Sequence, residues 1–139
     1  MLKPKSYYKK IVTEIFEIAT SKEEAINHLL NSMGIPASII GYEYIKQSVL
    51  ILLDDPCFYN RNIVKEIYPQ VAKICKAKSS SRVERGIRYA ISYIFENNKI
   101  TDEEKGVCLF VFNKSEELFR VSNSTFLFTL TRFAKEYTE

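Results

Sequence analysis

Apolar residues recur at helical spacing along most of the chain, and this periodicity limits the fold more than any other feature of the sequence. The 139 residues include only 4 Gly and 4 Pro. An all-β protein needs many tight turns and is therefore excluded. The sequence predicts a mostly helical protein, with amphipathic helices at about residues 7–20, 22–33, 38–53, 62–75, 81–96 and from residue 123 onward.

Local signals mark the ends of several of these helices. Ser21 is followed three residues later by Glu24, which is the pattern of a capped helix start, and Gly34 ends the same helix. The helix over residues 62–75 is expected to bend or start afresh near Pro69, because proline donates no backbone hydrogen bond. The apolar segment 107–112 fits either a short strand or a buried helical turn.

The composition is that of a water-soluble globular protein. Hydrophobic residues make up 46% of the chain and charged residues 27%, close to the average for folded domains. The longest strongly apolar run covers residues 49–53, whereas a membrane span needs about 20 residues. The N-terminus lacks the apolar stretch of a secretory signal. We therefore expect a cytoplasmic protein with no membrane partner.

The sequence does not predict an enzyme or a metalloprotein. Cys57, Cys75 and Cys108 form no C-x-x-C pair, and the lone His28 does not complete a zinc set with them. We expect the three thiols to be small core residues and His28 to be a bystander on a helix. The segment 54–56, Asp-Asp-Pro, is a better helix stop than a carboxylate pair for acid–base chemistry. We predict no catalytic residue, metal, cofactor or small-molecule substrate.

Positive charge is concentrated in one segment. The chain carries a net charge of +3, but residues 72–90 alone contain six cations and one anion. This segment therefore has a net charge of +5 and the remainder of the chain one of −2. A basic segment on a near-neutral body is typical of a phosphate-binding surface, although a solvated helix face has the same composition.

The helix over residues 81–96 has the pattern of a DNA recognition helix. Arg85 lies at the centre of its polar face, with Arg82 and Tyr89 towards one flank. The guanidinium groups suit guanine, and Glu84 suits the amino group of cytosine. Ser81 and Glu84 are expected to cap the first turn. The opposite face is an apolar stripe of Val83, Ile87, Ala90, Ile91 and Ile94.

The same helix also permits a purely structural interpretation. Glu84 and Arg88 stand four residues apart and can form an ordinary surface ion pair. Gly86 is a weak helix former that costs roughly 1 kcal/mol relative to alanine. It is tolerable where a neighbouring helix packs closely over it. The charge pattern alone leaves DNA binding and a solvated face open.

Four segments in order resemble the DNA-binding effector domain of the master sporulation response regulators of endospore-forming bacteria. Residues 81–91, S-R-V-E-R-G-I-R-Y-A-I, resemble the family's S-R-V-E-R-A-I-R-H-A-I. Residues 34–45, G-I-P-A-S-I-I-G-Y-E-Y-I, resemble its G-V-P-A-H-I-K-G-Y-x-Y-L. Residues 67–73, I-Y-P-Q-V-A-K, and the sequence from Asn123 to Phe126 match two further segments. The resemblance covers about residues 21–137.

The resemblance implies an all-α bundle of about six helices that contains a helix-turn-helix, here with an extra N-terminal helix. It divides the chain into an amphipathic arm, residues 1–20, and an effector-like domain, residues 21–139. Family members bind double-stranded DNA through base contacts that correspond to Arg82, Glu84 and Arg85, and they sit in tandem on adjacent boxes. A homodimer or tandem protomers on the bacterial nucleoid are expected. For phosphate contacts we predict Lys73, Lys76, Lys78, Ser79, Ser80, Ser81, Arg88 and Tyr89.

The chain departs from the family pattern at several points. Tyr89 replaces a histidine, Ile40 replaces a lysine, and the turn after Ala72 is one residue longer. Residues 99–121 hardly match. The family's receiver domain has no counterpart in residues 1–20, so we expect no control by phosphorylation within this chain. The N-terminal helix is expected to pack on the domain or to pair with another copy.

An interaction protein is the alternative to a DNA-binding regulator. Such a protein would antagonise or co-assemble with a full-length sporulation regulator. Exposed aromatic residues such as Tyr7, Tyr8 and Tyr59 suit a protein interface. Co-purification of a heteromer without any DNA affinity of its own would favour this alternative.

Overall fold

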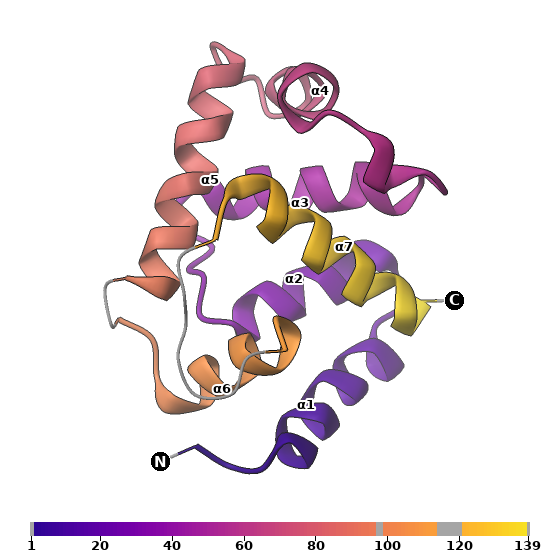
Figure 1. The fold of residues 1–139 in the computed structure, drawn as a ribbon, viewed down its shortest axis with the longest axis vertical. Helices are drawn as coiled ribbons and strands as arrows, with labels where there is room; N and C mark the ends of the chain where they lie inside the picture. Colours follow the sequence, from indigo (N-terminus) through magenta and orange to yellow (C-terminus); the bar gives the residue numbers. More distant parts are fainter. Residues whose placement is uncertain (1, 97–98, 114–120, 139) are drawn as a thin grey trace.

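The computed structural model describes residues 2–96, 99–113 and 121–138, and these residues contain seven α-helices and no strand (Figure 1). The expected all-α class is therefore confirmed. A 3-10 turn, Phe58–Asn60, and a π-helical segment, Ile63–Ile67, lie between α3 and α4. The α-helices are α1 (Lys5–Ile18), α2 (Lys22–Ser32), α3 (Ile40–Leu53), α4 (Tyr68–Ile74), α5 (Ser80–Phe95), α6 (Asp102–Val111) and α7 (Asn123–Thr138).

The most apolar helix, α3, occupies the centre of the bundle. It packs against α2, α4, α5 and α7. Ile45, Val49 and Leu52 on α3 are fully buried, because their helical spacing places them on the side that these neighbours cover. The position of α5 is therefore set largely by its contact with this central helix.

The signals at helix ends are confirmed in most places. The Ser21 side chain accepts a hydrogen bond from the backbone N–H of Glu24. Gly34 follows the C-terminal end of α2 and takes a left-handed backbone conformation, with a φ of 92°. A new α-helix starts at Tyr68, with Pro69 in its first turn, after the π-helical segment. The Glu24 carboxylate binds Thr20 rather than the Ser21 backbone, and this hydrogen bonding lowers the Glu24 pKa.

The segment that fitted either a strand or a helix is helical. It belongs to α6, whose start is fixed by a reciprocal capping box between Thr101 and Glu104. Val107 and Val111 are buried against the rest of the bundle. Residues 114–120, which complete the poorly matching stretch, lie outside the described part of the chain, as do Asn97 and Asn98.

The N-terminal helix α1 packs on the domain. It contacts α6, α2 and α7 at the end of the molecule opposite the α4–α5 turn (Figure 1). Tyr8 and Val12 are buried in the common core, at 4% and 0% exposure. Tyr8 was expected at the surface, and this prediction is wrong because α1 turns that edge towards α6. Tyr7 and Tyr59 are exposed, as predicted.

The three thiols differ in environment. Cys108 is buried, its pKa is raised by burial, and it contacts the carbonyl oxygen of Met33. Cys75 is half-buried. Cys57 is exposed, contrary to the expectation of a core residue, because it lies in the loop after α3 rather than on an apolar stripe. Among the described residues, no helix is long and apolar enough to cross a membrane.

Candidate nucleic-acid interface

Helices α4 and α5 form the expected helix-turn-helix. The two helices pack against one another and are joined by residues 75–79. The N–H of Ala77 donates to the carbonyl of Ala72 at 2.8 Å, and that of Lys76 donates to Lys73 at 3.3 Å. These bonds form a Schellman turn in which Lys76 takes the left-handed conformation, with a φ of 57°. The lysines at positions 73, 76 and 78 are exposed around this turn.

The cap of α5 is Ser79 and not Ser81 as predicted. The Ser79 side chain accepts the backbone N–H of Arg82 at 3.2 Å, so the helix begins two residues earlier than the Ser81–Glu84 pattern indicates. Ser81 is consequently a first-turn residue with an exposed side chain. All three consecutive serines have the chemistry of a cap, and the end of the Schellman turn selects the first.

A close backbone contact between α3 and α5 holds the predicted recognition helix in place. A Cβ atom added to Gly41 would lie 2.2 Å from the carbonyl oxygen of Gly86. A Cβ atom added to Gly86 would lie 2.7 Å from ring carbons of Tyr44. The two glycines therefore let α3 and α5 approach more closely than any larger residue allows. The close packing that makes a glycine at position 86 tolerable is therefore present.

One exposed face of α5 borders an open groove of about 610 Å³. The groove lies between this face and the start of α3, and Arg82 and Arg85 line it together with Tyr89. Both arginines are exposed, and no hydrogen bond or ion pair joins either guanidinium group to the described residues. Arg82 and Arg85 of the predicted site therefore expose guanidinium N–H donors that have no acceptor among the described residues.

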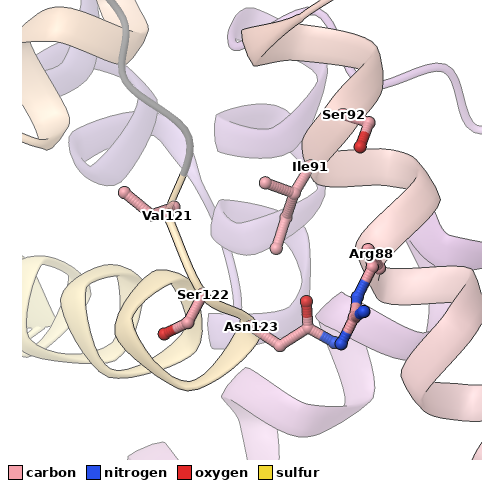
Figure 2. A pocket seen from close by; sticks show the side chains of 6 residues that line it. All are labelled: Arg88, Ile91, Ser92, Val121, Ser122 and Asn123. Carbon is pink, nitrogen blue, oxygen red and sulfur yellow. The ribbon is translucent and has the colours of Figure 1, made fainter.

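The other face of α5 is tied to α7. Arg88 pairs with Glu84 at 3.6 Å, and its side chain extends towards Asn123 at the edge of a pocket of about 410 Å³ (Figure 2). The Asn123 amide donates to the carbonyl oxygen of Glu84 and to the hydroxyl of Tyr68, each at 3.0 Å. Burial raises the pKa of Tyr68, so its hydroxyl stays protonated at neutral pH. This network fixes α5 against α4 and α7.

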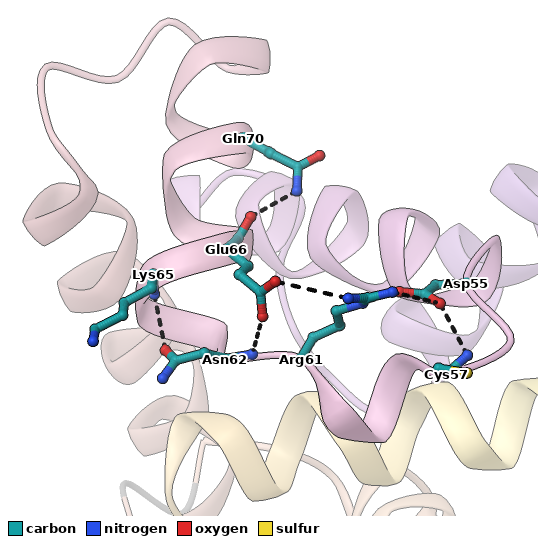
Figure 3. A network of polar contacts seen from close by, with 7 residues as sticks. All are labelled: Asp55, Cys57, Arg61, Asn62, Lys65, Glu66 and Gln70. Carbon is teal, nitrogen blue, oxygen red and sulfur yellow. Dashed lines mark hydrogen bonds and ion pairs between the residues drawn. The ribbon is translucent and has the colours of Figure 1, made fainter.

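Arg61, outside the candidate site, is an arginine whose guanidinium group is engaged in ion pairs within the protein. Arg61 lies between the carboxylates of Asp55 and Glu66 and ties the end of α3 to the π-helical segment (Figure 3). The hydrogen bond from Arg61 lowers the pKa of Asp55. The guanidinium group of Arg61 already has acceptors, whereas those of Arg82 and Arg85 have none among the described residues.

The structure thus divides the predicted site residues into three groups. Arg82, Arg85 and Tyr89 share the groove. Glu84 and Arg88 form the pair on the face towards α7. The remaining residues surround the start of α5, namely Lys73, Lys76, Lys78, Ser79, Ser80 and Ser81. Sequence reasoning did not place Ile40 and Asn123 beside α5, because both come from segments distant in the sequence.

Comparison with known families agrees with this geometry. Residues 26–133 match the family described as the sporulation initiation factor Spo0A C terminal. The chain belongs to this family. The match covers most of the chain, including α3 to α6 and the helix-turn-helix. Members of the Spo0A C-terminal family are DNA-binding effector domains of transcription regulators, so the groove and the basic turn lie on a domain of that class.

Proposed function

We propose that this chain is a sequence-specific regulator of transcription that inserts α5 into the major groove of double-stranded DNA. The observation that carries the proposal is the exposure of Arg82 and Arg85 on one edge of α5, where neither guanidinium group has an acceptor among the described residues. An unpaired guanidinium group offers the planar fork that binds the O6 and N7 atoms of guanine. Glu84 completes the proposed base contacts by accepting from cytosine.

The phosphate contacts are assigned to residues around the start of α5. The turn lysines Lys73, Lys76 and Lys78 are exposed, and the first backbone N–H groups of α5 point out of the same end of the helix. With Arg88 and Tyr89 further along the helix, these groups flank the arginine edge. Such contacts position a protein on DNA, whereas base contacts confer sequence preference.

The proposed regulator acts in the bacterial cytoplasm on the nucleoid, as a homodimer or as tandem protomers on adjacent boxes. We propose no reaction, cofactor or metal, and no phosphorylation step within these residues. Purified, unphosphorylated protein is therefore expected to bind DNA without any addition.

The test is selection of bound duplexes from a random pool at about 150 mM salt, where non-specific phosphate attraction is reduced. We expect enrichment of a short box containing G/C pairs. Arg82→Ala and Arg85→Ala are each expected to reduce the preference for that box about 10-fold to 100-fold, because each guanine contact is worth about 1–3 kcal/mol. The matched control is Arg132→Ala, which removes an exposed cation of α7.

A second variant separates base contacts from phosphate contacts. Lys76→Gln is expected to weaken binding to all duplexes by a similar factor and to lower the salt dependence by about one unit. If no box is enriched, or if Arg85→Ala leaves the preference unchanged, the proposal is wrong.

The alternative function is that of an interaction protein. The observation that favours it is the exposed aromatic side chain of Tyr59, which is 66% exposed. A stable heteromer without DNA affinity would support that alternative instead.

A further inference from the structure

The groove beside the two arginines has an apolar interior that the proposed guanine contacts do not use, and the proposed phosphate contact of Tyr89 uses its hydroxyl rather than its ring. Ile40, at the start of α3, is 59% exposed, and Tyr89 is 53% exposed. Both side chains line the groove together with the ring of Tyr44. Two large apolar side chains exposed at one place are unusual beside a cluster of cations.

Gly86 creates the space in which these apolar groups meet. It lies between Arg82 and Arg85 on one side and Tyr89 on the other along the same face of α5. A Cβ atom at Gly86 would lie 3.6 Å from the Cγ2 methyl of Ile40. Because α5 has no side chain there, the Tyr44 ring packs over its backbone and Ile40 lies beside that ring. The result is an apolar surface on the edge that carries the proposed guanine contacts.

The major-groove edge of DNA offers one apolar group, the C5-methyl of thymine. Resting on the proposed function, we propose that Ile40 and Tyr89 bind this methyl group at a thymine next to the guanines that Arg82 and Arg85 contact. The occupant follows from charge complementarity as well as from shape. The arginines on the rim, which have no acceptor among the described residues, attract the polyanion, and the interior accepts the apolar edge of the base beside them.

The test replaces each thymine of the selected box with deoxyuridine, which removes only the methyl group. We expect one position to weaken binding of the natural protein about 3-fold to 5-fold, the effect of losing one buried methyl group. Ile40→Ala and Tyr89→Ala are expected to bind the thymine and deoxyuridine duplexes with affinities that differ by less than twofold. Tyr89→Phe keeps the ring and is expected to retain the discrimination.

Control variants establish that the effect comes from this groove. Ile18→Ala and Tyr59→Ala remove equally exposed apolar side chains on other elements, and both are expected to discriminate like the natural protein. Ile40→Lys is expected to abolish discrimination and to steepen the salt dependence by about one unit, because a cation in that position contacts phosphate. Ile40 is exposed, so the thermal midpoint is expected to remain unchanged in its variants.

The outcomes separate this inference from the proposed function. If Arg85→Ala abolishes the preference while deoxyuridine has no effect at any position, the methyl-binding inference fails and the proposed function stands. A selected box without thymine beside its guanines, or unchanged discrimination by both alanine variants, also overturns the inference. Loss of self-association in Ile40→Ala would identify the groove as a protein interface and overturn it likewise. If the natural protein enriches no box, both proposals fail together.

Discussion

The two exposed faces of α5 both carry arginines but have different surroundings. On the groove face, Arg82 and Arg85 extend over an open space without acceptors among the described residues. On the other exposed face, Arg88 pairs with Glu84, and Asn123 binds the backbone of the same turn. The contrast indicates that one face of the proposed recognition helix holds it in place while the other is left open to solvent.

This division affects the role of Glu84. Its carboxylate is paired with Arg88, so a contact to cytosine requires the pair to open or to be shared. Exposed pairs of this kind are worth only about 0.2–1 kcal/mol, and the side chains are 40% and 59% exposed. A base contact of about 1–3 kcal/mol therefore exceeds the cost of opening the pair.

The largest expected effect comes from breaking the contact that positions the groove face. Gly41→Ala is expected to lower the free energy of unfolding by about 3 kcal/mol, the upper end for overpacking. The reason is that the new methyl group meets the Gly86 backbone rather than a movable side chain. Chemical denaturation measures the change, and Ser38→Ala, at an exposed position before α3, is the control. A neutral Gly41→Ala would show that this contact does not fix α5.

The next effect concerns the face towards α7. Asn123→Ala is expected to lower the free energy of unfolding by about 1–2 kcal/mol, because it removes two hydrogen bonds and leaves the Glu84 carbonyl without this donor. Denaturation of Asn123→Ala, Tyr68→Phe and the double variant measures the coupling between the two side chains. Ser124→Ala, at the next residue, removes a hydroxyl that forms no hydrogen bond with the described residues, and it is expected to be neutral. Equal losses of stability in Asn123→Ala and Ser124→Ala would contradict the role of this network.

The smallest expected effect is that of Arg88→Ala. Losing the surface pair is expected to reduce stability by only about 0.3 kcal/mol. If Arg88 also contacts phosphate, the salt dependence of DNA binding falls by about one unit. Lys73→Ala provides the comparison, because it removes a cation that forms no ion pair with the described residues and is expected to change the salt dependence alone. A large loss of sequence preference in Arg88→Ala would place this residue among the base contacts.

Much of the fold was predictable because short-range patterns dominate it. The stripe of Val83, Ile87 and Ile94 is buried as its spacing predicts, and Gly34 ends α2. Where the local sequence fitted two structures equally well, the prediction of the helix cap was wrong and the prediction of the secondary structure stayed open. Ser79 rather than Ser81 caps α5. The apolar segment 107–112 belongs to the helix α6, which packs against α1. The boundary between residues 1–20 and 21–139 stays a prediction.

The candidate site divides in the same way. The exposed arginine edge of α5 follows from the local sequence, since the helical period places Arg82 and Arg85 opposite the buried stripe. Which cations have no acceptor among the described residues depends on the packing of the helices, because the carboxylates and amides that could pair with them come from distant segments. Asn123 reaches α5 from the far end of the chain, and Ile40 enters the groove from α3. Such contacts depend on how helices pack, and no local spacing in the sequence encodes them.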